Sequence, residues 1–302
     1  VGESGCGKTT LVNCVSGLVR ATSGSVALAG EEVAADVGHR PRGALRRMQM
    51  VFQDPDLSLN PQHTVAEIMD RAVEVLGNGS REDRTQRVIN LLKRVGLGEH
   101  YLSRHPVELS GGEKQRVAVA RALAGNPDVV LADEATSALD VSVRSAILNL
   151  LCDLQAEEGM AYLFISHDMS AIRYVSDWVM VLYLGMIMEI GPMERVFARP
   201  CHPYTEALIS AIPIPDPDLK SAPIRLEGSL PSADRRARGC PFHTRCPRKI
   251  GQICETETPP WQESAHQHHI FCHIPLEELY QMEMETTAPV HKMVPAGQTV
   301  SV

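Results

Sequence analysis

The sequence lacks any run of apolar residues as long as the roughly 18 to 20 that a membrane-spanning helix needs. It also lacks a basic surplus, because 29 lysines and arginines stand against 37 aspartates and glutamates, for a net charge of −8. A chain-wide electrostatic footprint for nucleic acid is therefore missing. No internal repeat is present. Any membrane role is expected to come through partner subunits.

The composition that is present is ordinary for a globular protein, with 44% hydrophobic and 22% charged residues. A length of 302 residues suits one large domain with an appendage, or two modest domains. Hydrophobic spacing predicts helices at 7–19, 64–76, 81–95, 111–123 and 141–154, and strands at 26–29, 48–53, 128–132, 162–165, 177–183 and 186–190. The last two strands flank Gly185 and are predicted to form a hairpin. Strands that alternate with helices predict a doubly wound, mostly parallel α/β sheet.

The first motif is a phosphate loop, G-x-x-x-x-G-K-[ST], formed by Gly2, Glu3, Ser4, Gly5, Cys6, Gly7, Lys8 and Thr9, with Thr10 directly after it. Its glycines let backbone N–H groups close around phosphate oxygens at the positive end of the following helix. Lys8 is expected to reach the β- and γ-phosphates of a nucleotide, and the Thr9 hydroxyl to ligate Mg²⁺. Such a loop normally follows a buried strand, of which only Val1 is left. We therefore expect an N-terminally truncated chain that folds poorly alone.

The second motif is a pair of carboxylates that follows the apolar run 129–132. This run predicts a buried parallel strand, which places Asp133 at its carboxyl end, where open α/β sheets bind ligands. Asp133 is expected to hold Mg²⁺, and Glu134 to polarise the attacking water as general base. Adjacent carboxylates alone are common on surfaces, but a pair that ends an apolar strand downstream of a phosphate loop is specific.

The third motif is LSGGEKQ at 109–115, in which Ser110 caps a predicted helix that Gly111 and Gly112 open. The free N–H groups of such a helix, together with the serine, can donate to a phosphate. An ordinary capped helix is the plain alternative. In order with the other two motifs, this segment resembles the signature of the ATP-binding-cassette (ABC) family.

The resemblance implies further roles for residues that match the family pattern in order. Gln53 resembles the Q-loop residue that senses Mg²⁺, so Thr9, Gln53 and Asp133 would hold the metal. Residues 137–140 resemble the D-loop, which ends at Asp140, and His167 resembles the switch histidine that holds the γ-phosphate. Two such domains would pack head to tail, with Ser110, Gly111 and Gly112 serving the opposite chain's ATP. The family's adenine-stacking aromatic residue lies upstream of the loop, outside this sequence.

The fold that the resemblance implies is an ABC cassette over residues 1–211, with a helical subdomain at about 54–125. Composition changes after Ala211, where a proline-rich linker begins. A small, irregular, cysteine-containing lobe is expected at 212–282, and a disordered tail at 283–302.

A closer resemblance, to ATP-binding subunits of oligopeptide, dipeptide and nickel importers, covers nearly the whole chain. It is carried by the segments QDPDLSLNP (53–61), HPYTEAL (202–208), IPDP (214–217), LEGSLP (226–231) and GCPFHTRC (239–246). It implies ATP hydrolysis that energises import, most often of peptides, with nickel, glutathione and sugars as other cargoes. The partners would be a non-identical second ATPase, two permease subunits and an extracytoplasmic binding protein, at the cytoplasmic face of the inner membrane. The alternatives are a soluble ABC ATPase that works on DNA or ribosomes, and a non-catalytic regulatory cassette.

Four of the eight cysteines, Cys240, Cys246, Cys254 and Cys272, fall within the last quarter of the chain. Four thiolates suit a [4Fe–4S] cluster or tetrahedral zinc. Relatives with this pattern hold a [4Fe–4S] cluster, so the cluster is favoured and zinc is the alternative. The nearby histidines His243, His266, His268, His269 and His273 keep mixed-ligand zinc open. Reduced thiols in a small lobe are the third interpretation.

Overall fold

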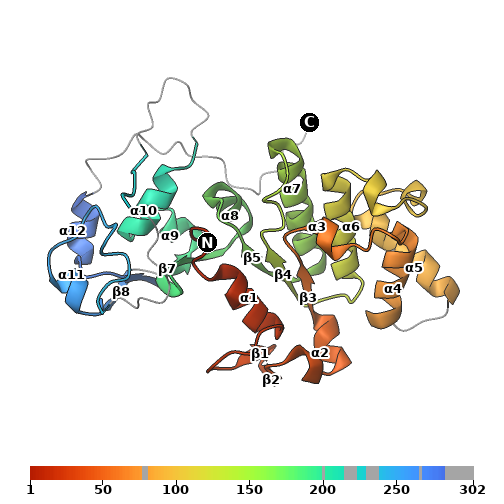
Figure 1. Ribbon diagram of the computed structural model, residues 1–302, viewed down its shortest axis with the longest axis horizontal. Coiled ribbons are helices and arrows are strands. Elements are labelled where there is room, and N and C mark those ends of the chain that lie inside the picture. The colour runs from red at the N-terminus through yellow and green to blue at the C-terminus, as the bar shows by residue number, and fades with distance from the viewer. Residues whose placement is uncertain (77–80, 199–200, 214–222, 229–237, 265–266, 283–302) are drawn as a thin grey trace. The chain divides into compact units, whose positions relative to one another are not determined.

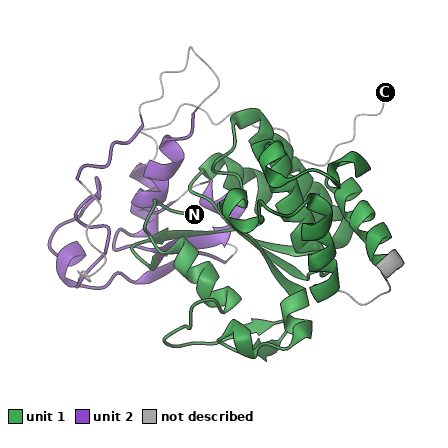
Figure 2. Cartoon of the chain, turned by 45° about the vertical axis from the view of Figure 1, so that its right-hand side comes forward, with its two compact units in different colours: residues 1–186 green, residues 187–302 purple. Residues whose placement is uncertain are grey.

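The computed structural model describes residues 1–76, 81–198, 201–213, 223–228, 238–264 and 267–282. The expected tail at 283–302, the IPDP segment at 214–217, the end of LEGSLP and His266 lie outside these residues. The chain divides into two compact units, residues 1–186 and 187–302, which Figure 2 colours separately. Among the described residues, no helix combines the length and apolarity that a membrane crossing requires.

Unit 1 is built on the predicted parallel sheet, in the order β3 (Met48–Val51), β4 (Val129–Asp133) and β5 (Ala161–Ile165). The register pairs Val51 with Ala132 and Asp133 with Ile165, so the carboxyl ends of all three strands meet at one edge. Leu131 and Ile165 pack with Val12 of α1 (Lys8–Ser16) on one face. Because side chains alternate along a strand, Val130 and Ala132 belong to the larger core on the other face.

Helices build the larger core of unit 1, and the doubly wound α/β architecture predicted from the sequence is confirmed by these layers (Figure 1). They are α4 (Val65–Leu76), α5 (Arg81–Arg94), α6 (Gly111–Leu123) and α7 (Val141–Glu158). The shorter elements of the unit are α2 (Arg42–Arg47), α3 (Pro55–Ser58), α8 (Met169–Val175), β6 (Trp178–Tyr183), η1 (Val37–His39), η2 (Glu99–Tyr101) and η3 (Pro106–Glu108). After β6, Leu184 and Gly185 have φ of 47° and 78°, as a type I′ hairpin turn requires.

One small hairpin was only half predicted. β1 (Val26–Leu28) was expected, but its antiparallel partner β2 (Glu31–Val33) was not. The strand carries two adjacent glutamates and so shows no apolar alternation. The two turn residues, Ala29 and Gly30, have positive φ of 50° and 83°, but Ala-Gly is not among the residue pairs that identify such a turn in a sequence.

Unit 2 contains β7 (Met186–Pro192) from Ile187 onward, and in it β7, β9 (His268–Phe271) and β8 (Trp261–Ser264) pair in that order. Its helices are α9 (Met193–Val196), α10 (Pro203–Ser210), α11 (Ile253–Thr256) and α12 (Leu276–Gln281). A wholly buried polar network joins these elements: Glu189 Oε1 lies 2.7 Å from His268 Nε2, and Glu189 Oε2 accepts the His202 N–H at 2.8 Å. This compact unit begins at Ile187, and the domain boundary expected at 211–212 from composition stays a prediction.

The His202 side chain caps α10, since its Nδ1 accepts the N–H of Tyr204 at 3.0 Å. Burial lowers the pKa of His202 to about 3, against the opposing effect of a hydrogen bond to the Phe271 carbonyl. The unfolded chain, with a histidine pKa of about 6.5, then binds more protons than the folded chain as the pH falls through the window between these values. We expect this one group to remove about 2 kcal/mol of folding free energy between about pH 7 and about pH 5.

Denaturant unfolding across that pH range measures this prediction. The slope of folding free energy against pH should shrink in His202→Asn, because asparagine can cap the helix without titrating. An unchanged slope in this variant would show that His202 is not the group that titrates.

Candidate functional site

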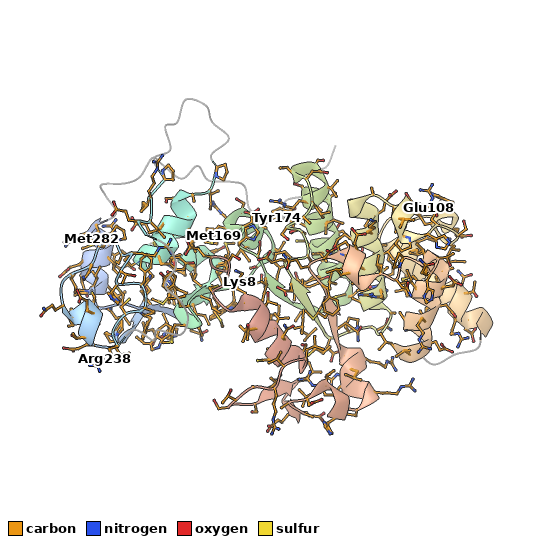
Figure 3. The ribbon with its side chains drawn as sticks, in the orientation of Figure 1. Lys8, Glu108, Met169, Tyr174, Arg238 and Met282 are labelled. Atoms are coloured by element: carbon orange, nitrogen blue, oxygen red, sulfur yellow. The ribbon has the colours of Figure 1, made fainter. Side chains whose placement is uncertain are left out.

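The phosphate loop lies at the N-terminal end of α1, where Figure 3 labels Lys8. Gly2, Gly5 and Gly7 all have positive φ, between 81° and 154°. A side chain at Gly2 could not fit, because its Cβ would lie 2.2 Å from the Leu182 carbonyl oxygen. Lys8 is buried, and its Nζ donates to the carbonyls of Gly2 at 2.7 Å and Glu3 at 3.0 Å. A buried cation inside a loop of backbone donors is suited to binding an anion.

The carboxyl end of β4 carries Asp133, which is buried and faces the first turn of α1. Its Oδ1 accepts the hydroxyl of Thr9 at 3.3 Å, across 124 residues of sequence. The pKa of Asp133 is raised above its ordinary value. Burial is the largest cause and the charge of Glu134 adds to it, while the Thr9 hydrogen bond and the charge of Lys8 oppose it. A hydroxyl and a carboxylate side by side are oxygen ligands of the kind that Mg²⁺ takes. Gln53, the third expected ligand, follows β3 at the same edge of the sheet.

Glu134 is the point at which three loops meet. Its Oε2 accepts from Gln53 Nε2 at 3.1 Å, and its Oε1 lies 3.3 Å from Nδ1 of His167, which follows β5. Its backbone has φ of 45°, unusual for a residue with a side chain, and its N–H donates to the Ile165 carbonyl at 3.0 Å. A backbone held in a sparsely populated conformation is typical of functional sites. Glu134 is thus positioned by the two residues that the sequence placed beside it in function.

The LSGGEKQ segment forms a capping box at the start of α6. The Glu113 carboxylate accepts the N–H and the hydroxyl of Ser110, at 2.7 and 2.8 Å, and the hydroxyl of Tyr101. The Tyr101 hydrogen bond, followed by those from Ser110, lowers the pKa of Glu113. Glu113 and Tyr101 were not predicted as part of the site. The Ser-x-x-Glu spacing was the signal that could have found Glu113.

The signature glycines contact the segment that follows the acidic pair. A Cβ at Gly112 would lie 2.5 Å from Val143, and one at Gly111 would lie 3.6 Å from Leu139. Asp140, expected to bind nucleotide, caps α7, with its Oδ1 accepting the Val143 N–H at 2.9 Å. In the part of the chain that the structure describes, no hydrogen bond links Ser110 or Asp140 to Lys8, Thr9 or Glu134. The predicted residues therefore fall into two groups within one chain. The catalytic group comprises Lys8, Thr9, Gln53, Asp133, Glu134 and His167, and the signature group comprises Ser110, Gly111 and Gly112.

A cavity of about 790 Å³ has Thr9 and Asp133 in its lining. Gln53 also lines it, and the rest of the lining is mixed, with apolar side chains such as Leu45, Phe52 and Leu57 beside polar and charged ones. Besides Asp133, the charged residues of this lining are Arg40, Asp54 and Arg121. Leu57, on α3, is 87% exposed. The catalytic edge of the sheet is thus continuous with an open groove of mixed apolar and polar lining, which we call the Q-loop groove.

The four C-terminal cysteines are free thiols in unit 2, three of them buried and Cys246 half-buried. Burial is the chief cause that raises the pKa of Cys240 to about 12, of Cys246 to about 11 and of Cys272 to about 12. Each also interacts electrostatically with Cys254, so the thiols share one neighbourhood. Among the described residues, no group of three or more Cys, His, Asp or Glu side chains is arranged to hold a metal ion.

Comparisons with known proteins agree with this geometry. The ABC transporter family model matches residues 1–137, and the model of the oligopeptide/dipeptide transporter C-terminal region matches residues 188–254. A probable peptide ABC transporter ATP-binding protein of Sinorhizobium fredii is 46% identical, over 91% of this chain and 77% of that protein. The oligopeptide transport ATP-binding protein OppF of Escherichia coli is 44% identical, over 90% of this chain and 82% of its own. The corresponding protein AppF of Bacillus subtilis is 41% identical, over 91% and 84%.

Solved structures show the same fold. A dimeric ATP-binding cassette in a post-hydrolysis state with ADP and Pi matches with a TM-score of 0.55 and 31% identity, over 64% of this chain and 83% of that one. The cbiO1 subunit of a Clostridium perfringens ABC transporter complex matches with a TM-score of 0.58 and 30% identity, over 66% and 78%. The similarity therefore extends from sequence to three-dimensional structure.

Proposed function

The chain belongs to the ABC transporter ATP-binding proteins of the oligopeptide/dipeptide importer family, and from this premise we propose how its residues divide the work. It is an ABC ATPase that energises peptide import. We assign one ATP to Lys8, Thr9, Gln53, Asp133, Glu134 and His167. The observation that carries this assignment is the placement of Glu134 between Gln53 and His167, beside the Thr9–Asp133 pair.

In this assignment, Lys8 and the loop N–H groups neutralise the β- and γ-phosphates, and Thr9, Gln53 and Asp133 would hold Mg²⁺. The metal would supply charge neutralisation on the phosphate oxygens. Glu134 accepts a proton from water as the water oxygen bonds to the γ-phosphorus and the bond to the β-γ bridging oxygen breaks. The bridging oxygen keeps the electron pair and leaves with ADP. His167 orients Glu134 through Nδ1 and contacts the γ-phosphate.

The signature group serves a second nucleotide. Ser110, Gly111 and Gly112 have no hydrogen-bonded link to the catalytic group within the described chain, which supports a role toward the ATP of an opposed subunit. That subunit is proposed to be a non-identical ATPase, packed head to tail. The dimeric cassette among the similar structures supports the pairing of two such domains. The helical subdomain at about 54–125 is the part that would carry the signature to the partner.

The Q-loop groove is the proposed contact with the permease subunits. It joins an exposed apolar surface at Leu57 to Gln53, which touches the catalytic base. A permease segment seated there could therefore move Gln53 directly. The subunit would then sit at the cytoplasmic face of the inner membrane, in contact with the permease. An extracytoplasmic binding protein would deliver peptide to that permease from the other side.

Leu57→Glu tests this contact, because a charge placed in the groove opposes an apolar partner without touching the nucleotide group. We expect peptide-stimulated ATP hydrolysis in the reconstituted importer to fall at least about tenfold, since one buried leucine contributes roughly 1.5–3 kcal/mol. Basal hydrolysis should not change. Val75→Glu, on exposed α4 surface outside the groove, is the matched control. Stimulation that survives Leu57→Glu would remove the groove as the coupling site.

A [4Fe–4S] cluster on Cys240, Cys246, Cys254 and Cys272 is the proposed cofactor of unit 2, with zinc as the alternative. Four thiols in one neighbourhood fit either group by donor chemistry, although the described side chains are not arranged as a metal site. Binding of either group would require the thiols to lose their protons. The raised pKa values of Cys240 and Cys272 oppose this loss. Iron, sulfide and zinc content of anaerobically purified full chain distinguishes the two, and absence of all three would leave reduced thiols.

Hydrolysis by the subunit, reconstituted with its permeases and a peptide-loaded binding protein, tests the function as a whole. We expect peptide to stimulate turnover. Hydrolysis that ignores peptides, in a subunit that does not co-purify with permeases, would instead support a soluble ABC ATPase.

A further inference from the structure

Arg144, in the first turn of α7, bridges two loops of the catalytic edge. Its Nη1 donates to Asp168 Oδ2 at 3.0 Å, and its Nη2 donates to the Leu139 carbonyl at 3.1 Å. Both contacts are partly buried, since 29% of the Arg144 side chain and 28% of the Asp168 side chain are exposed. None of the recognised motifs includes this arginine.

The first contact leads to the switch histidine. Asp168 directly follows His167, and its other oxygen, Oδ1, caps α8 by accepting the N–H groups of Ser170 and Ala171. Figure 3 labels Met169 and Tyr174 on this helix. Asp168 is therefore held at both oxygens. It is joined through one peptide bond to His167, whose Nδ1 lies 3.3 Å from Glu134 Oε1.

The second contact leads to the D-loop. Leu139 precedes Asp140, the cap of α7, and lies beside Gly111 of the signature segment. At the start of the same loop, the N–H and the hydroxyl of Ser137 both donate to the Glu134 carbonyl at 3.0 Å. The D-loop thus runs from the catalytic base to the signature glycine, and Arg144 holds its far end.

The chemistry of arginine suits this bridge. A guanidinium is planar and always charged, and it presents several donors in a fixed fork, so that one group can fix two acceptors at a set separation. A hydrogen bond from it to a carboxylate is also stronger than one between neutral groups. A lysine ammonium at this position is a point charge on a flexible stem and cannot hold both acceptors in one geometry.

We propose that Arg144 is a positioning residue for ATP hydrolysis, which couples the D-loop to the switch histidine through Asp168. It touches no reacting atom. It acts by keeping His167 in reach of Glu134 when the D-loop is in place, so that a displaced D-loop releases the histidine. The inference rests on the proposed roles of Glu134 and His167.

The test compares Arg144→Ala and Arg144→Lys in the reconstituted importer. We expect Arg144→Ala to lower kcat by about 10²-fold, because a displacement of about 1 Å of a catalytic group costs this much. ATP affinity should stay within about twofold, and Arg144→Lys should fall between alanine and the parent. Arg71→Ala, which removes an exposed arginine paired with Glu74, is the control.

A double variant separates positioning from folding. If Arg144 acts through His167, adding Arg144→Ala to His167→Ala should change kcat by less than about threefold, because coupled residues are not additive. The proposal would be overturned if the kcat losses of the two single variants multiplied in the double variant. It would also be overturned if Arg144→Ala kept the kcat and the melting temperature of the parent. Glu134→Gln is assayed in parallel. Substantial turnover by Glu134→Gln would refute Glu134 as the base. The coupling between Arg144 and His167 would still be measured by the double-mutant cycle of those two residues.

Discussion

Replacing Glu134 with glutamine is expected to leave ATP bound and to reduce hydrolysis by about 10² to 10⁴-fold, the range typical of a positioned proton acceptor. Glutamine has nearly the same shape, so it can still meet Gln53 and His167, which lie 3.1 and 3.3 Å from the carboxylate. It cannot take a proton from water. The loss should therefore appear in kcat, with little change in ATP affinity.

Single-turnover hydrolysis and nucleotide binding, measured on the same preparation, check this expectation. Asp153→Asn removes an exposed carboxylate from α7, away from the catalytic edge, and should behave like the parent. Asp133→Asn gives a useful contrast, because loss of a metal-holding carboxylate should weaken binding as well as turnover. Substantial steady hydrolysis by Glu134→Gln would mean that another group accepts the proton.

The catalytic edge could be predicted from the sequence because its parts are local motifs placed by one topological rule. Lys8 and Thr9 open α1, and Asp133 and Glu134 end a strand whose apolar run is visible in the sequence. Parallel pairing then brings the strand ends together. Gln53 and His167 were assigned from the family resemblance, and the strands that precede them, β3 and β5, bring both side chains to Glu134.

The contacts that the sequence did not predict are non-local ones between single polar residues. Arg144 meets Asp168 across 24 positions, and Glu189 meets His268 across 79. Neither pair has a spacing or a periodicity that a pattern could detect. The histidines of unit 2 illustrate the consequence, since His268 was considered as a metal ligand and is engaged by Glu189 instead.

Removing Glu189 should produce the largest loss of stability in unit 2. Its side chain and that of His268 are 0% and 1% exposed, and the carboxylate also accepts the His202 N–H. Burial raises the pKa of Glu189, while the hydrogen bond and charge of His268 lower it. Glu189→Ala leaves a buried imidazole and a buried N–H without their acceptor. Breaking a buried pair in this way costs roughly 3–5 kcal/mol.

Denaturant unfolding of the full chain, followed by a probe in unit 2 such as Trp261 fluorescence, measures this loss. Glu255→Ala, which removes the exposed partner of Lys249, is the matched control and should change little. The double variant Glu189→Leu/His268→Leu should recover part of the loss, because replacing both partners of a buried pair removes the unpaired group that one substitution leaves behind. Recovery would show that the buried pair contributes little net stability compared with two apolar side chains. If the double variant were as unstable as the sum of the single ones, the two side chains would be acting independently, and the 2.7 Å contact would not be what holds the strands in register.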